Sequence, residues 1–207
     1  MENGKKLFLP PDGLELVLAS GSPRRSDLLK QIGLENFLSD AADIDETIRK
    51  LEAPKKYAAR VALEKAETAR HRHPRCVVLA ADTVVTCGTR ILDKPTSKNQ
   101  AEKCLRRLSG RSHKVLGAFV VIGADNQYVK RLVVSSVTFK RLDEQEINNY
   151  LTSGEWIGKA GGYAIQGRGA AFIKKIQGSY SNVVGLPLHE VYNALRGLGF
   201  NYKECNR

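Results

Sequence analysis

Aromatic residues and long apolar runs are scarce in this sequence. Phe, Trp and Tyr make up 7% of its 207 residues, and no run of lysine and arginine alternates with them. Proteins that stack single-stranded nucleic acid need such an alternation, so we expect no stable nucleic-acid binding. The opening residues MENGKKLFLPPDG contain two prolines and no long apolar stretch, which is typical of neither a signal peptide nor a membrane span. We expect residues 1–13 to form a flexible N-terminal arm, residues 14–207 to form a single domain, and no contact with a membrane.

Cysteine is also scarce, and its spacing matches no disulfide or metal motif. The four cysteines include no C-x-x-C pair. Cys76 and Cys104 fall within apolar patterns, which is typical of reduced thiols in a core. These features favour a cytoplasmic protein.

Two common phosphate-binding motifs are absent. The sequence holds no G-x-x-x-x-G-K-[ST] loop, and Gly167-Arg168-Gly169 precedes the strand-like segment AAFIKKI instead of the helix of a Rossmann fingerprint. Any phosphate must therefore be bound by other means.

Positive charge is what the sequence has in excess. Lysine and arginine total 33 against 22 acidic residues, a net charge of +11. An excess of this size predicts an anionic partner, and the scarcity of aromatic residues favours a small phosphate ligand over a polynucleotide.

The stretch from Leu14 to Gly33 offers such a site at its central turn. An apolar strand runs into Ser20-Gly21-Ser22, and a helix follows, with Ser22 as its N-cap and Gly33 at its end. Arg24 and Arg25 lie in the first helical turn, where positive charge opposes the helix dipole. Guanidinium groups placed there suit phosphate oxygens. The alternative is that both arginines are solvated surface residues.

Asp82 interrupts the most apolar segment of the chain, Cys76 to Thr86. The β-branched residues of that segment predict a central strand. A buried carboxylate is costly unless it is paired, protonated or bound to metal, so Asp82 is a candidate base or metal ligand. Alternatively it lies at a solvent-facing strand end. The turn that follows is expected to bring Lys94 back near Asp82.

Lys65 lies on the apolar face of a helix predicted from Pro54 to Arg70. It either extends to the helix edge or reaches a buried anion. Glu64 is expected to pair with Arg60 one turn earlier.

A glycine-rich segment runs from Gly154 to Gly169, with six glycines in sixteen residues. Glycines allow the backbone to approach a ligand closely, and Gln166 and Lys159 are the polar side chains best placed to contact it. Around this segment, periodicity predicts a helix after Ser97, a hairpin over residues 115–140, a helix over residues 143–153 and a last helix from residue 188. The predicted fold class is α/β.

Five sequence blocks, taken together, resemble the Maf (septum-formation inhibitor) family. They are S-G-S-P-R-R at 20–25, A-D-T at 81–83, L-D-K-P at 92–95, G-K-A-G-G-Y-A-I-Q-G at 158–167 and V-V-G-L-P at 183–187. The resemblance implies an inosine-triphosphatase-like fold, with a mixed twisted sheet flanked by helices and two lobes around a central cleft. It also implies a homodimer that uses a divalent metal cation, Mg²⁺ or Mn²⁺, to cleave nucleoside triphosphates into monophosphate and pyrophosphate.

The resemblance also assigns residues. Asp82 matches the proton acceptor of the family, and Glu46, Lys65 and Lys94 match its other catalytic positions. Arg24, Thr83 and Gln166 match positions tied to base choice, in the combination of the dTTP/UTP branch. We expect Glu46 and Asp82 to hold the metal, and the substrate to contact Ser20, Ser22 and Arg25 as well. The alternatives are a 7-methyl-GTP or CTP pyrophosphatase of the same family, or a basic nucleic-acid-binding module.

Overall fold

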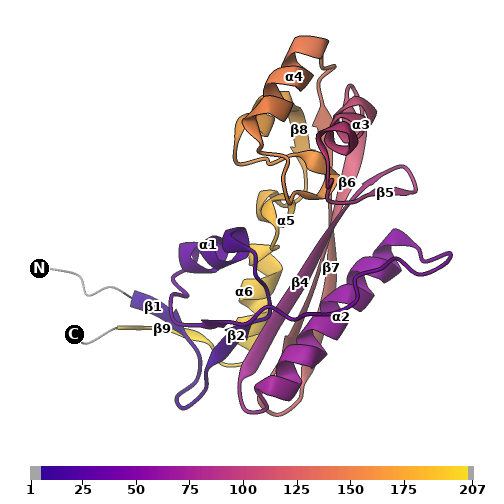
Figure 1. The fold of residues 1–207 in the computed structure, drawn as a ribbon. Coiled ribbons are helices and arrows are strands. Elements are labelled where there is room, and N and C mark those ends of the chain that lie inside the picture. Colours follow the sequence, from indigo (N-terminus) through magenta and orange to yellow (C-terminus); the bar gives the residue numbers. More distant parts are fainter. Residues whose placement is uncertain (1–5, 205–207) are drawn as a thin grey trace, which may run out of the picture.

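A mixed seven-stranded sheet runs through the molecule (Figure 1). The computed structural model describes residues 6–204. The strands of this sheet are β2 (Leu16–Leu18), β3 (Leu38–Ser39), β4 (Val77–Cys87), β5 (Arg90–Leu92), β6 (Ser112–Ile122), β7 (Tyr128–Phe139) and β8 (Ile173–Gln177). Their order is β3-β2-β4-β6-β7-β8, with β5 paired to β4. β2 runs parallel to β3 and β4, and the other pairings are antiparallel. The predicted mixed α/β fold is confirmed.

One face of the sheet is covered by α2 (Pro54–Arg72), the longest helix (Figure 1). The residues at helical spacing on its inner side are fully buried against alternate residues of β4 and β6: Ala58, Val61, Ala62, Ala66 and Ala69. Small side chains there let the helix lie close to the strands. Neither α2 nor any other helix within residues 6–204 is both long and apolar enough to cross a membrane.

The opposite face carries the larger core and the remaining helices. These are α1 (Pro23–Gln31), α3 (Lys98–Leu108), α4 (Glu144–Ser153), α5 (Tyr180–Val184) and α6 (Leu188–Gly197), with 3₁₀ turns at Ala160–Gly162 and Arg168–Phe172. In Figure 1, α1 and α6 lie toward one end of the long strands β4, β6 and β7, and α3, α4 and β8 lie toward the other. The long strands therefore join two lobes.

Three of the cysteines are free thiols that are partly buried: Cys76, Cys87 and Cys104. Burial raises the pKa of the Cys76 and Cys104 thiols, which disfavours the reactive thiolate. Cys205 lies outside the described residues.

The N-terminal residues differ from the expected flexible arm. β1 (Lys6–Leu9) pairs antiparallel with β9 (Asn201–Glu204). Phe8 is fully buried, with its ring centroid 4.9 Å from that of Tyr192 and 5.2 Å from that of Tyr202. The expectation is therefore wrong for residues 6–9, because it rested on local prolines and the partner strand comes from the far end of the chain. Residues 1–5 lie outside the described range.

This packing predicts that Phe8→Ala destabilises the protein. Removing a fully buried aromatic ring should lower the free energy of unfolding by about 3 to 5 kcal/mol, as measured by urea titration. Leu51→Ala is the control, because Leu51 is 96% exposed and its truncation should change stability by less than about 0.5 kcal/mol. An equally small effect for Phe8→Ala would contradict the packing of β1 and favour the expected flexible arm.

Candidate active site

Asp82 lies in the middle of β4 and is buried, 6% exposed. Side chains alternate along a strand, so Asp82 shares its face with Val78, Ala80 and Val84, which pack against α2. The helix supplies the counter-charge, because Lys65 Nζ lies 3.1 Å from Asp82 Oδ1. The solvent-facing alternative for Asp82 is therefore wrong.

Lys65 joins two carboxylates. Its side chain is 9% exposed, and Nζ also lies 2.7 Å from Glu46 Oε1. Of the two alternatives for Lys65, the structure shows the buried anion. Removing one partner of such a buried pair leaves an uncompensated charge, so the three side chains depend on one another. Glu46 is the outer member, with 39% of its side chain exposed on the loop before α2.

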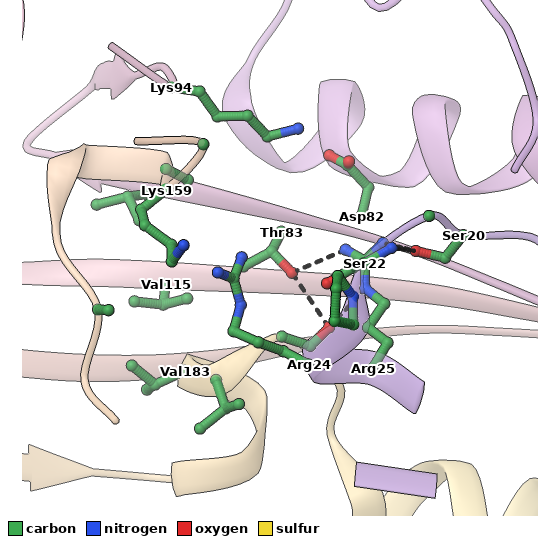
Figure 2. Close-up of a pocket in the computed structure, with 18 of the residues that line it drawn as sticks. Ser20, Ser22, Arg24, Arg25, Asp82, Thr83, Lys94, Val115, Lys159 and Val183 are labelled. Atoms are coloured by element: carbon green, nitrogen blue, oxygen red, sulfur yellow. Dashed lines mark hydrogen bonds between the residues drawn. The ribbon is translucent and has the colours of Figure 1, made fainter. Parts of the chain in front are cut away.

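Arg25 is a buried arginine held by neutral oxygen atoms. Its Nη1 donates to Ser20 Oγ at 2.8 Å, its Nη2 to Thr83 Oγ1 at 3.2 Å, and its Nε to the Gly185 carbonyl at 2.9 Å (Figure 2). Burial lowers the pKa of Arg25, and the charge of Asp82 acts in the opposite direction. Within residues 6–204, no carboxylate forms an ion pair with Arg25. The guanidinium therefore keeps charge and free N–H donors for a bound anion.

The start of α1 is open toward the same space. Ser22 occupies the N-cap position, as predicted, but its side chain makes no capping hydrogen bond. Its backbone N–H donates to Ser20 Oγ at 3.2 Å. Arg24 is half-buried, and burial lowers its pKa. The Ser22 hydroxyl and the backbone N–H of Arg24 are thus available to an anion, whereas Pro23 has no N–H and that of Arg25 donates to the Ser22 carbonyl at 3.1 Å.

The glycine-rich segment forms the opposite wall. Lys159 extends from it toward Arg24 (Figure 2), and its ammonium donates to the Ile157 carbonyl at 3.2 Å. Burial, and then the charge of Arg24, lower the pKa of Lys159. Gln166 is exposed on the same segment. These two side chains are the ones that the sequence indicated as polar contacts.

A pocket of about 460 Å³ lies between these elements, within the usual size range for small-ligand sites. Five cationic and two acidic side chains line it, so it is suited to a polyanion. Lys94, exposed after β5, extends into it on the same side as Asp82 (Figure 2). All the residues predicted for the site line this pocket: Ser20, Ser22, Arg24, Arg25, Glu46, Lys65, Asp82, Thr83, Lys94 and Gln166. Their individual roles stay predictions.

Glu46 and Asp82 are the side chains that fit a divalent cation. Carboxylate oxygens suit Mg²⁺ or Mn²⁺, and such ions take one or two protein carboxylates with substrate phosphates completing the shell. Within residues 6–204, no group of three or more His, Cys, Asp or Glu side chains is placed to hold a metal ion. The donor set therefore fits a cation that arrives with a phosphate ligand, and not an all-protein cage.

Two groups that shape the site, the Gly185 carbonyl and the Tyr57 hydroxyl, leave no signal in the sequence. The Gly185 carbonyl accepts from both Arg25 and Thr83, the latter at 3.3 Å, and no side chain marks that role. Tyr57 on α2 donates from its hydroxyl to the Glu46 carbonyl at 3.0 Å. Its place on the apolar stripe of α2 looks like ordinary core packing.

The family model described as Maf-like protein matches residues 15–198 of this chain. The chain belongs to the Maf family. A dTTP/UTP pyrophosphatase from Paramagnetospirillum magneticum is 54% identical to it over 185 residues, covering 89% of this chain and 97% of that protein. Another, from Caulobacter vibrioides, is 52% identical over 188 residues, covering 91% and 97%. Among solved structures, a HAM1 protein from Coxiella burnetii aligns with 18% identity and a TM-score of 0.49 over 89% of this chain and 99% of that one. All the predicted site residues lie within the span of the Maf model.

Beneath the pocket of this Maf protein lies a buried histidine. His113 on β6 is 2% exposed, and its Nε2 is 2.8 Å from the hydroxyl of Tyr163, a residue that lines the pocket. Its Nδ1 has no hydrogen-bond partner among the described residues. Burial lowers the pKa of His113 from 6.5 to about 4.

The protein should therefore lose stability as the pH falls from about 6.5 to about 4. In that window the unfolded chain binds a proton at residue 113 and the folded chain does not, so unfolding is favoured at lower pH. His113→Gln should flatten the pH dependence by up to about 1.4 kcal/mol per pH unit, measured by urea titration at several pH values. Identical slopes for the two proteins would contradict a neutral buried imidazole.

Proposed function

We propose that this Maf-family chain hydrolyses the α–β phosphoanhydride of dTTP and UTP, giving the nucleoside monophosphate and pyrophosphate. The observation that carries the proposal is the buried Asp82, 3.1 Å from Lys65 Nζ in a pocket lined by five cations. The names of the curated relatives, dTTP/UTP pyrophosphatases over nearly their whole length, support the substrate class.

The chemistry follows from the two kinds of charge. A water oxygen bonds to the α-phosphorus, and the bond from that phosphorus to the bridging oxygen breaks, so the electron pair leaves with pyrophosphate. Asp82 accepts the water proton. Lys65 holds the carboxylate in place through its Oδ1 atom. Arg24, Arg25 and Lys94 stabilise the negative charge that grows on the phosphate oxygens.

We assign the divalent cation to Glu46 and Asp82, the two carboxylates that line the pocket. Mg²⁺ or Mn²⁺ bound there would polarise the phosphoryl oxygens and neutralise part of their charge.

Base selection is assigned to Thr83, Gln166 and Arg24. Thr83 Oγ1 donates its proton to the Gly185 carbonyl and accepts from Arg25, so toward a ligand it can only accept. Thymine and uracil present a ring N–H that such an acceptor suits. The Gln166 amide can both donate to a pyrimidine carbonyl and accept from the ring N–H.

A homodimer and a cytoplasmic location are also proposed. The homodimer is supported by the family resemblance, and the cytoplasmic location by the free thiols of Cys76, Cys87 and Cys104. We further propose no stable binding to nucleic acid, because aromatic stacking residues are scarce.

The proposal is tested by incubating the purified protein with a panel of nucleoside triphosphates and Mg²⁺ and measuring pyrophosphate release. We expect dTTP and UTP to give the highest kcat/KM. A preference for 7-methyl-GTP or CTP would move the protein to another branch of the family. Salt-sensitive polynucleotide binding without pyrophosphate release would contradict the enzymatic function.

Asp82→Asn should lower kcat by at least about a hundredfold, because the amide keeps the size of the side chain but cannot accept the proton. Thermal unfolding should show that the variant remains folded. Asp27→Asn is the matched control and should keep wild-type turnover, because Asp27 is an exposed acid in the middle of α1 that does not line the pocket. A folded Asp82→Asn variant with most of its activity would remove Asp82 from the mechanism.

A further inference from the structure

Glu46 lies on a segment that has no regular secondary structure. Residues 40–53 connect β3 to α2, and no helix or strand forms among them. These residues are all exposed or half-exposed, and although Ile44 packs against the core beneath α2, the core by itself gives the backbone at residues 46 and 47 little support. The catalytic geometry nevertheless needs the Glu46 carboxylate beside Lys65. Arg72 binds the Asp40 carboxylate at 2.8 Å and the Ala41 carbonyl at 3.1 Å at the start of the segment, so further contacts must hold it near Glu46.

Two consecutive carbonyl groups of the segment are held by α2. The hydroxyl of Tyr57 donates to the Glu46 carbonyl at 3.0 Å. Arg60 Nη2 donates to the Thr47 carbonyl at 3.0 Å. These hydrogen bonds act on the backbone at Glu46 and at the next residue, so they fix where the Glu46 side chain starts.

Arg60 is itself held firmly. It forms a bidentate ion pair with Glu52, Nε to Oε1 at 2.7 Å and Nη2 to Oε2 at 2.9 Å, and its Nη1 contacts Glu64 Oε2 at 2.9 Å. The side chains of Arg60 and Glu52 are only 13% and 9% exposed. The hydrogen bond from Arg60 lowers the pKa of Glu52 to about 2, so this pair stays ionised at neutral pH. The guanidinium also lies over the Tyr57 ring, 5.5 Å from its centroid.

The same helix carries Lys65, the side-chain partner of Glu46. Tyr57, Arg60 and Lys65 all belong to α2. The groups that bind the backbone at residues 46 and 47 and the ammonium that pairs with the Glu46 carboxylate therefore share one rigid element. A rigid helix thus sets the distance between them. The turn before α2 is closed by hydrogen bonds of its own, since the Arg49 N–H donates to Glu52 Oε2 at 3.0 Å and the Glu52 N–H donates to the Arg49 carbonyl at 3.0 Å.

We propose that Tyr57 and Arg60 are positioning residues, which hold the Glu46 carboxylate beside Lys65 and Asp82 by binding the backbone at residues 46 and 47. The inference rests on the proposed function, since it assigns Glu46 a part in the reaction. Neither Tyr57 nor Arg60 is required to touch the reacting atoms. Their effect on turnover should therefore pass entirely through Glu46.

A double-mutant cycle tests this dependence. Arg60→Met should lower kcat/KM for dTTP by about tenfold to a hundredfold, because a displacement of about 1 Å in a catalytic group has effects of that size. In a Glu46→Gln background, the same Arg60→Met change should lower kcat/KM less than about threefold, because the group it positions is already gone. Arg60→Lys should recover only part of the loss, since an ammonium cannot bind Glu52 and the Thr47 carbonyl in the same planar geometry.

Arg49→Met is the matched control. Arg49 also pairs with Glu64, at 2.9 Å, but its side chain is 66% exposed and donates to no backbone carbonyl of the segment. The Arg49→Met substitution removes one positive charge, as Arg60→Met does, together with one ion pair, and should leave kcat/KM within about threefold of wild type. Tyr57→Phe is a milder variant that removes only the hydroxyl, and it replaces Arg60→Met in the cycle if Arg60→Met folds poorly. It should likewise lower kcat/KM in the wild-type background and have little effect in the Glu46→Gln background.

The outcomes separate the two proposals. If Glu46→Gln alone leaves turnover unchanged, the assignment of Glu46 in the proposed function is wrong. If Glu46→Gln is impaired but the Arg60→Met and Tyr57→Phe effects multiply with it at full size, the positioning role is wrong and the proposed function stands.

Discussion

The site depends on one buried charge arrangement, in which Lys65 lies between Asp82 and Glu46. A lone carboxylate at the position of Asp82, in the centre of a strand, would be strongly unfavourable. The ammonium offsets that cost at 3.1 Å and also draws the outer carboxylate to 2.7 Å. Strand periodicity turns Asp82 toward α2, and helix periodicity turns Lys65 toward the sheet, so two ordinary patterns bring the charges together.

The opposite side of the pocket is basic for a different reason. Arg25 is buried without a carboxylate partner among the described residues, and its donors are shared among Ser20, Thr83 and the Gly185 carbonyl. These contacts join the start of α1, the middle of β4 and the end of α5. The protein thus keeps uncompensated positive charge facing the cavity, which a triphosphate would neutralise. The same contacts leave Thr83 Oγ1 as an acceptor toward a ligand, so under the proposed function phosphate and base recognition would be linked through one hydrogen-bond network.

Much of this could be predicted from local sequence rules. The broken strand pattern at Asp82, the lysine on an apolar stripe and the arginines at a helix start each violate a rule, and all of these residues line one pocket. Other features leave no local mark. β1 needs β9 from the other end of the chain, the Gly185 contribution comes from a backbone carbonyl, and Tyr57 and Arg60 act through contacts with a segment of irregular structure. Sequence periodicity reports which face a residue is on, but not which distant backbone it meets.

The most direct test of this account measures the coupling between Lys65 and Asp82 as free energies of unfolding in urea. Lys65→Met should destabilise the protein by about 3 kcal/mol, because it leaves a buried carboxylate without its partner. Adding Asp82→Asn to that variant should recover at least about 1 kcal/mol, because the unpaired charge is then gone. Strictly additive losses, within about 0.5 kcal/mol, would show that the two charges do not depend on each other and would contradict the account.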